Sequence, residues 1–404
     1  MSRSGLPFRT VTVLHGLLAA LLTCAIAGCG GRGSTAGPPS DLIFAGDMVV
    51  LGYNDLGMHC MNQDFSQFMI LPPYNTLHAQ VIDRSGERPR IVTSDVTVSY
   101  TIPSNTHSSD KTNFWTYALQ LLGVPLAPDV GLTGNGLSGA MTPTADNDWA
   151  VTGIPMTPIT DSGQEDAYQL ATVTVRGSHS RALAQTRAVV PVSWEISCIL
   201  CHNGDDAPAS VLEAHDSLHG TNLASQTPVR CGSCHAQAPL GALGQGQPGV
   251  SSLSQAMHLA HASRMEDVMA GLDGMECYAC HPGKRTRCLR DVHYSAGMDC
   301  HNCHESMSAV GSPSRRPWVD EPRCGNCHNK AGSTYEQPGK LYRDSVGHHG
   351  VHCAACHGSP HAITPTVVAA DNMQASGIQG HTGPINTCTV CHHSQPSGEF
   401  QHRF

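Results

Sequence analysis

The stretch Cys198-Ile-Leu-Cys201-His202 is the first of seven copies of one pattern, Cys-x-x-Cys-His, in the second half of this 404-residue chain. The other copies begin at Cys231, Cys277, Cys300, Cys324, Cys353 and Cys388. With 18 cysteines and 25 histidines in the whole chain, random placement would give well under one such match. The repeat therefore reflects a chemical requirement, and we expect the fold of the second half to serve it.

The spacing within each copy suits covalent attachment of a haem. Two thiols separated by two residues can form thioethers with the two vinyl groups on one edge of a porphyrin, and the next residue can bind the iron as proximal ligand. Zinc ribbons also use Cys-x-x-Cys pairs, but they need no histidine directly after every second cysteine. The predicted attachment residues are Cys198, Cys201, Cys231, Cys234, Cys277, Cys280, Cys300, Cys303, Cys324, Cys327, Cys353, Cys356, Cys388 and Cys391, and the predicted proximal ligands are His202, His235, His281, His304, His328, His357 and His392.

Through these motifs, residues 196–404 resemble the multihaem c-type cytochromes. The resemblance implies seven covalently bound haem c groups, electron transfer as the function, and haem attachment outside the cytoplasm. The intervals between motifs hold only one or two short helices and a loop. Porphyrins would then supply much of the apolar surface that side chains supply in other domains. We therefore expect the haems to pack against one another.

Each iron needs a second axial ligand, and the identity of that ligand sets the potential and the reactivity. Further histidines outnumber the seven vacancies, which favours bis-histidine coordination, although methionines such as Met265, Met275, Met298, Met307 and Met373 could replace some. Position before, inside or just after a motif selects seven distal ligands: His219, His261, His293, His301, His349, His361 and His381. By the same reasoning His348, His352, His393 and His402 face solvent or bind propionates.

The chain begins with a segment typical of export. Arginines precede a largely apolar run from Val11 to Ile26, which is too short and too interrupted for a comfortable membrane span. The run ends in Ile26-Ala27-Gly28-Cys29, which resembles a bacterial lipobox. This resemblance implies a lipoprotein signal peptide over residues 1–28 and lipidation of Cys29, with the outer membrane as destination. Ordinary cleavage to a soluble protein and an uncleaved anchor are the alternatives. Residues 29–44 are predicted to be a flexible tether.

Residues 45–195 lack the motif and have the pattern of a β domain. Apolar and polar residues alternate over 96–102 and 170–175, as in half-buried strands. Further strands are predicted at 48–52, 77–82, 90–93 and 188–194, a hairpin turn at 84–87 and a helix over 112–122. Many short strands between Gly/Pro/Asn-rich loops favour a sandwich. The expected fold is multidomain: an all-β sandwich-like domain over 45–195, then a mostly α or irregular multihaem cytochrome c domain over 196–404.

One stretch of the first half, Met58-His59-Cys60-Met61, sets four potential soft-metal ligands side by side. Three interpretations stay open: a turn packed against the haem half, His59 as a distal ligand, or a separate metal site. Cys60 and Cys288 belong to no motif, and the sequence leaves a disulfide between them undecided. Arginines between residues 285 and 323 either pair with haem propionates or form a solvated basic face.

A formal net charge of −9 and the lack of a basic stripe argue against nucleic-acid binding. The leading hypothesis is an electron-transfer protein at the cell envelope, an outer-membrane lipoprotein that faces the periplasm or the exterior. Its expected partners are other redox proteins or cytochromes, or an extracellular acceptor. One alternative is a multihaem reductase with an open iron, although no Cys-x-x-Cys-Lys motif occurs. The other is a filament-forming conductive cytochrome. No catalytic residue is predicted.

Overall fold

The computed structural model describes residues 46–196, 198, 201–202, 207–265, 276–328 and 335–397. All of them belong to one compact unit, Pro38–Phe404. The predicted signal peptide, the whole tether with Cys29, Met275 and His402 lie outside the described residues.

The first half is organised around a strand that is buried on both faces. This strand, β1 (Met48–Tyr53), pairs antiparallel with β4 (Asn75–Asp83), and β4 pairs on its other edge with β9 (Trp149–Ile154). Beyond β9 lies β8 (Thr142–Pro143), and β5 (Arg90–Ile91) pairs with the end of β4. Because five of the six residues of β1 are buried, something must cover each side of it.

A second antiparallel sheet covers one side. Its strands are, in order, β11 (Ala182–Val189), β10 (Leu170–Arg176), β6 (Thr97–Thr101) and β7 (Ser138–Ala140). Residues from both sheets share one hydrophobic core, which includes Val50, Leu77, Val81, Val151, Val98, Tyr100, Val173 and Ala188. Helix α1 (Phe114–Leu122) adds Phe114 and Ala118 to this core. Alternating side chains thus bury the facing sides of the two sheets against each other.

The second half consists of short helices and turns joined by loops. Its helices are α2 (Ala207–His219), α3 (Leu253–Ala262), α4 (Val292–Ser295), α5 (Cys300–His304), α6 (Met307–Val310), α7 (Cys353–His357) and α8 (Met373–Gln379). Its 3₁₀ segments are Cys231–Ser233, Ala238–Gly244, Glu276–Ala279, Cys324–Asn326, Tyr342–Asp344, His348–Gly350, Ala369–Asn372 and Cys388–Val390. Within the described residues, every helix is too short or too polar to span a bilayer.

Short strand pairs connect distant segments. In parallel pairs, β2 (His59–Cys60) lies beside β12 (Val192–Ser193), and β3 (Phe68–Met69) lies beside β13 (Val229–Arg230) of the second half. A third pair, β14 (Val346–Gly347) and β15 (Val351–His352), is a local hairpin. The β3–β13 pair therefore ties the two halves together through backbone hydrogen bonds.

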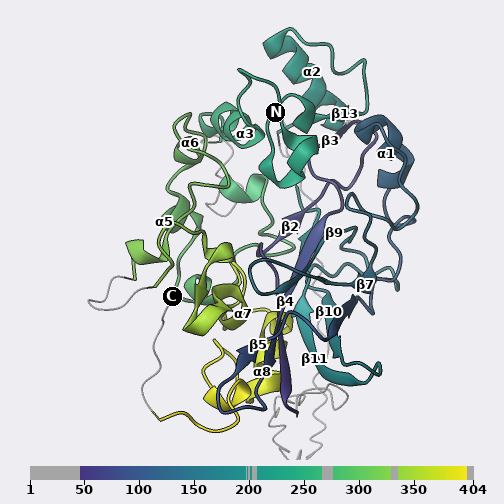
Figure 1. The fold of residues 1–404 in the computed structure, drawn as a ribbon. Helices are drawn as coiled ribbons and strands as arrows, with labels where there is room; N and C mark the ends of the chain where they lie inside the picture. Colours follow the sequence, from purple (N-terminus) through teal and green to yellow (C-terminus); the bar gives the residue numbers. More distant parts are fainter. Residues whose placement is uncertain are drawn as a thin grey trace, which may run out of the picture. The chain divides into compact units, whose positions relative to one another are not determined.

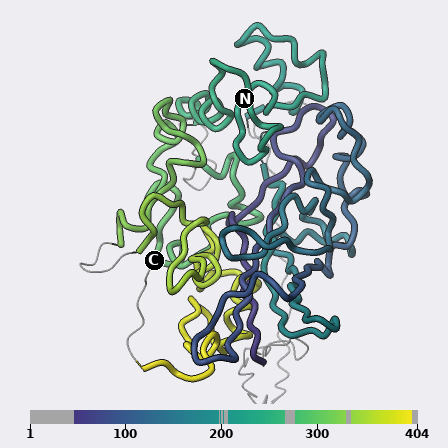
Figure 2. The backbone as a smooth tube through the Cα atoms, in the orientation of Figure 1, coloured from purple at the N-terminus to yellow at the C-terminus, as the bar shows by residue number. Residues whose placement is uncertain are grey.

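The second half covers the other side of β1. Val49, Leu51 and Tyr53 form a second buried cluster with Ala354 and Ala355 of α7, and Val390 also belongs to it. In Figure 1, α7 and α8 lie beside β1 and β11, and Figure 2 shows the yellow carboxy-terminal segment returning to the purple first strand. Alternate residues of β1 thus belong to two different cores, because successive side chains of a strand point to opposite faces.

Polar contacts cross the expected boundary at residue 195 as well. The carboxylate of Glu195 accepts hydrogen bonds from the backbone N–H groups of Lys284, Arg285 and Thr286, at 2.6–3.0 Å. Burial alone would raise the pKa of Glu195, but these donors outweigh it and the pKa is lowered. On β1, the amide of Gln374 both donates to and accepts from the backbone of Gly52. The two halves therefore share buried surface and buried polar groups.

Several predicted elements occur close to their expected positions, namely the strands at 48–52, 77–82, 90–93, 96–102 and 170–175, the turn at 84–87 and the helix at 112–122. The strand expected over 188–194 differs. There β11 ends at Val189, Pro191 interrupts the run, and only Val192–Ser193 pairs again, with β2. Proline has no N–H to donate to a ladder, which explains the break.

Candidate haem sites

Each Cys-x-x-Cys-His motif is folded as one tight helical turn. In five of them the N–H of the motif histidine donates to the carbonyl oxygen of the first cysteine at 2.8–3.0 Å. The other two motifs are the short helices α5 and α7. Residues three apart lie on the same side of a helical turn, so each motif presents its two thiols together, with the histidine directly after them.

Within the described residues, six motif histidines face a second imidazole. The six pairs and the distances between their ring centres are His202 and His261 at 6.5 Å, His235 and His215 at 6.2 Å, His281 and His258 at 6.1 Å, His304 and His361 at 6.0 Å, His328 and His293 at 6.2 Å, and His392 and His348 at 6.2 Å. A bond from a metal to an imidazole nitrogen is about 2 Å long, so two rings that share one metal from opposite sides have centres about 6 Å apart. The spacing fits an iron between the rings of each pair.

In these imidazoles Nδ1 takes part in a hydrogen bond, and Nε2 is the nitrogen that would bind a metal. On α3, Nδ1 of His258 lies 2.6 Å from the carbonyl oxygen of Ser254, and Nδ1 of His261 lies 2.7 Å from that of Met257. The same nitrogen is engaged in His235 by Ser251, in His215 by Thr221, in His293 by Asp291 and in His361 by Cys288. Such a partner fixes the tautomer and the ring orientation and leaves Nε2 for a metal.

The electrostatic environment of two motif histidines, His281 and His304, keeps them neutral. Burial, followed by the neighbouring imidazoles, lowers the pKa of His281 to about 4. Burial and then His361 lower the pKa of His304 to about 4 as well. A neutral imidazole is the form that binds metals, so no proton has to be displaced from these two rings near neutral pH.

Comparison of the chain with family models, with curated proteins and with solved structures finds no match. The ligand assignment therefore rests on the motifs and on the geometry of the imidazole pairs.

Three of the seven predicted distal ligands lie opposite a motif histidine: His261, His293 and His361. None of them faces the motif that follows it in the chain. His261 faces the first motif, and His293 faces the fifth. Sequence proximity is therefore a poor guide to which motif a histidine serves, because the chain folds back between motifs.

At the other positions the structure differs from the prediction. The ring of His219 lies 4.8 Å from that of His215, one helical turn away on α2, and it is His215 that faces His235. His349 likewise lies beside His348, which faces His392. Position in the chain relative to a motif cannot distinguish histidines one residue or one helical turn apart, since their rings lie side by side.

The sequence reasoning also missed His258, which faces His281. His258 and His261 are three residues apart on α3, which begins with a capping box at Ser252. That spacing puts both rings on one helical face. It is the sequence signal that would have identified both histidines as candidate distal ligands. The seventh predicted ligand, His381, makes hydrogen bonds to Thr382 and Thr387.

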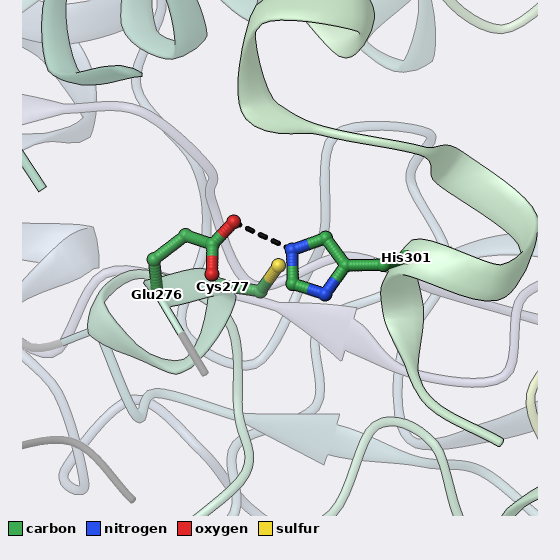
Figure 3. Close-up of side chains that lie close together, drawn as sticks. All are labelled: Glu276, Cys277 and His301. Carbon is green, nitrogen blue, oxygen red and sulfur yellow. Dashed lines mark hydrogen bonds and ion pairs between the residues drawn. The ribbon is translucent and has the colours of Figure 1, made fainter. Parts of the chain in front are cut away.

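His301, predicted as a distal ligand from inside the fourth motif, lies against Glu276 instead. Its Nε2 is 2.6 Å from a carboxylate oxygen, and Glu276, Cys277 and His301 bring their ligand atoms within 4.8 Å of one another (Figure 3). The hydrogen bond to Glu276 raises the pKa of His301. Since Cys277 is the first cysteine of the third motif, this group is better explained as an ion pair beside that motif than as a separate metal site.

The stretch Met58-His59-Cys60-Met61 is largely buried and includes strand β2, and the residues just before it contact the second half. The carbonyl oxygen of Gly57 accepts a hydrogen bond from Arg290 at 2.6 Å, and that of Asn54 accepts one from Ser359 at 2.7 Å. Of the three interpretations the contacts favour packing against the second half, but the segment is a paired strand and not a turn. Cys60 and Cys288 are both free thiols.

Proposed function

We propose that this protein is a multihaem c-type cytochrome with seven covalently attached haems, and that it transfers electrons. The observation that carries the proposal is the set of six imidazole pairs, each with one motif histidine and a spacing that fits a metal. Histidines placed at random around a motif would not repeat one spacing six times.

In this proposal the chain's residues have distinct tasks. The two cysteines of each motif anchor the porphyrin edge, the motif histidine supplies one axial ligand, and the facing histidine supplies the other. Bound haem would contribute an iron that changes oxidation state by one electron. The carbonyl oxygens of Ser251, Ser254 and Met257 hold the Nδ1 protons, so that the rings keep their orientation in both oxidation states.

The arrangement of the second ligands favours closely spaced haems. Helix α3 carries the facing histidines of the first and third motifs, three residues apart. Next to it lies α6, which directly follows the fourth motif: the side-chain amide of Gln255 reaches the carbonyl oxygen of Arg315 at 3.0 Å, and Met307 packs against the cluster of Met265 and Ala279. One short helix thus supplies the facing histidines of two motifs and lies beside the helix that follows a third, which favours a short path between those haems.

Two histidine ligands at each of six motifs favour electron transfer over catalysis at those positions. An iron with two protein ligands has no position left for a substrate, and reductases of this class keep one iron open. A multihaem reductase and a conductive filament remain the alternatives. Turnover of nitrite or hydroxylamine would favour the reductase, and filaments in electron micrographs of purified protein would favour the polymer.

For the first half we propose a sandwich-like scaffold whose outer face carries the sixth and seventh motifs. The second cluster, in which Val49, Leu51 and Tyr53 contact Ala354 and Ala355, supports this role. From the leader we further propose export, lipidation at Cys29 and an outer-membrane location, with redox proteins or an extracellular acceptor as partners.

The central test is the mass and spectrum of the mature protein expressed with a c-type cytochrome maturation system. We expect the polypeptide mass plus seven haems, and a low-spin spectrum that responds fully to reductant. A bare-polypeptide mass or a spectrum without Soret absorption would refute the proposal. A dominant high-spin signal would instead favour the reductase.

A further inference from the structure

His361 adopts a backbone conformation that histidine rarely takes. Its φ is 62°, in the left-handed region that costs a residue with a Cβ free energy unless its surroundings hold it there. The N–H of Arg290 donates to the carbonyl oxygen of His361 at 3.0 Å, and the N–H of Val292 donates to that of Ile363 at 3.1 Å. The segment from Cys288 to Val292 therefore holds the segment that carries His361.

The holding segment is itself firmly anchored. Arg290 is 1% exposed, forms two hydrogen bonds to the carboxylate of Asp371, and donates to the carbonyl oxygen of Gly57. Its guanidinium also lies 4.9 Å from the ring centre of Tyr168. These partners fix the backbone on both sides of Cys288 and Arg290, so the position of the Cys288 side chain is well determined.

Cys288 directs its sulfur at the imidazole of His361. The distance from Sγ to Nδ1 is 3.7 Å, within reach for a hydrogen bond to sulfur. The imidazole of His361 also lies near that of His304 of the fourth motif, with 6.0 Å between ring centres and a tilt of 50°. His361 therefore has one neighbour suited to its Nδ1 proton and another suited to sharing a metal through Nε2.

We propose that Cys288 is a positioning residue for the fourth haem, which accepts the Nδ1 proton of His361 and thereby tunes the potential of that haem. The inference rests on the proposed function and extends it to one residue that no motif explains. The other engaged distal ligands bond to oxygen acceptors, as in His258 with Ser254. Sulfur is a weaker acceptor, so the fourth haem differs chemically from its neighbours.

The direction of the effect follows from ligand basicity. An acceptor on Nδ1–H makes the imidazole a stronger donor to the metal, which favours the more highly charged ferric state. Removal of the acceptor therefore raises the potential. Residues that hydrogen-bond to a metal ligand change the metal affinity by about tenfold or more. A tenfold preference for one oxidation state corresponds to a change in reduction potential of about 59 mV for one electron.

The experiment compares Cys288→Ala, Cys288→Ser and Cys60→Ala in the full-length protein loaded with haem. Haem content is measured by mass, and the potentials are measured by spectroelectrochemical titration with paramagnetic resonance of the ferric haems. We expect seven haems in every variant. In Cys288→Ala one haem should shift upward by about 59 mV and change its ferric g-values. The hydroxyl of Cys288→Ser should prevent that shift, and Cys60→Ala should match the parent.

The possible failures are distinguishable. Seven haems with unchanged potentials in Cys288→Ala would overturn the role of Cys288 and leave the proposed function standing. Equal shifts of the potential in Cys288→Ala and Cys60→Ala would also overturn the role of Cys288, because the shift would then not depend on its contact with His361. If Cys288→Ala fails to fold, Cys288→Val, which also lacks an acceptor, takes its place, and unchanged potentials in that variant would overturn the role of Cys288. A parent protein without haem would defeat both proposals.

Discussion

The buried ion pair of Arg290 and Asp371 offers the sharpest test of how the two halves are joined. Arg290→Met removes two hydrogen bonds to Asp371, at 2.6 and 3.0 Å, and the one to Gly57 at 2.6 Å. Both side chains of the pair are almost fully buried, with 1% and 6% exposed. Loss of one partner leaves a buried carboxylate uncompensated, which costs about 3–5 kcal/mol. We expect the free energy of unfolding to fall by about 4 kcal/mol.

The assay is denaturant unfolding of the haem-loaded protein, followed by circular dichroism and by Soret absorption so that two-state behaviour is checked. Arg316→Met is the matched control, since Arg316 also pairs with an aspartate, Asp320, but is exposed. It should leave stability unchanged. The double variant Arg290→Met with Asp371→Leu should recover much of the loss, because it leaves no unpaired charge. A loss below about 1 kcal/mol in Arg290→Met, or an equal loss in the control, would refute the reasoning.

Three further predictions concern other parts of the molecule. His361→Ala should convert one low-spin haem to high spin in paramagnetic resonance, and an unchanged spectrum would contradict its assignment as a ligand. Gly57→Ala should destabilise the protein by about 1–3 kcal/mol in the same unfolding assay, because a Cβ there would overlap the carbonyl oxygen of Pro360. Gly86→Ala, where a Cβ has only ordinary contacts, should be tolerated. Burial opposes ionisation of Asp148, but hydrogen bonds from a histidine, a threonine and a tyrosine lower its pKa from 3.8 to about 2. Its contribution to stability, about 2 kcal/mol, is therefore complete above about pH 4 and is lost as the pH falls toward 2. Asp148→Asn should show a flatter stability profile over that acid range, and a profile parallel to that of the parent would contradict the linkage.

Local sequence patterns identified the elements whose signal is contained in a few neighbouring residues. The alternation at 96–102 corresponds to β6, and the helical spacing at 112–122 to α1. In contrast, β11 has the sequence Ala-Leu-Ala-Gln-Thr-Arg-Ala-Val, with only two large apolar residues, so its pattern was too weak to recognise. It is a strand because β10 and the core beneath it select that conformation.

The sequence by itself determined the chemistry that this chain can offer, which is seven pairs of thiols, each followed by an imidazole. Each of these groups is recognisable because it lies within five consecutive residues. Only the tertiary structure decided which second imidazole faces each of them, as His361 faces His304 across more than fifty residues of chain. The physical reason is the distance along the chain between the residues that interact. A helical turn is specified by neighbours along the chain, whereas the meeting of two rings depends on how distant segments pack, here around β1 and the buried Arg290.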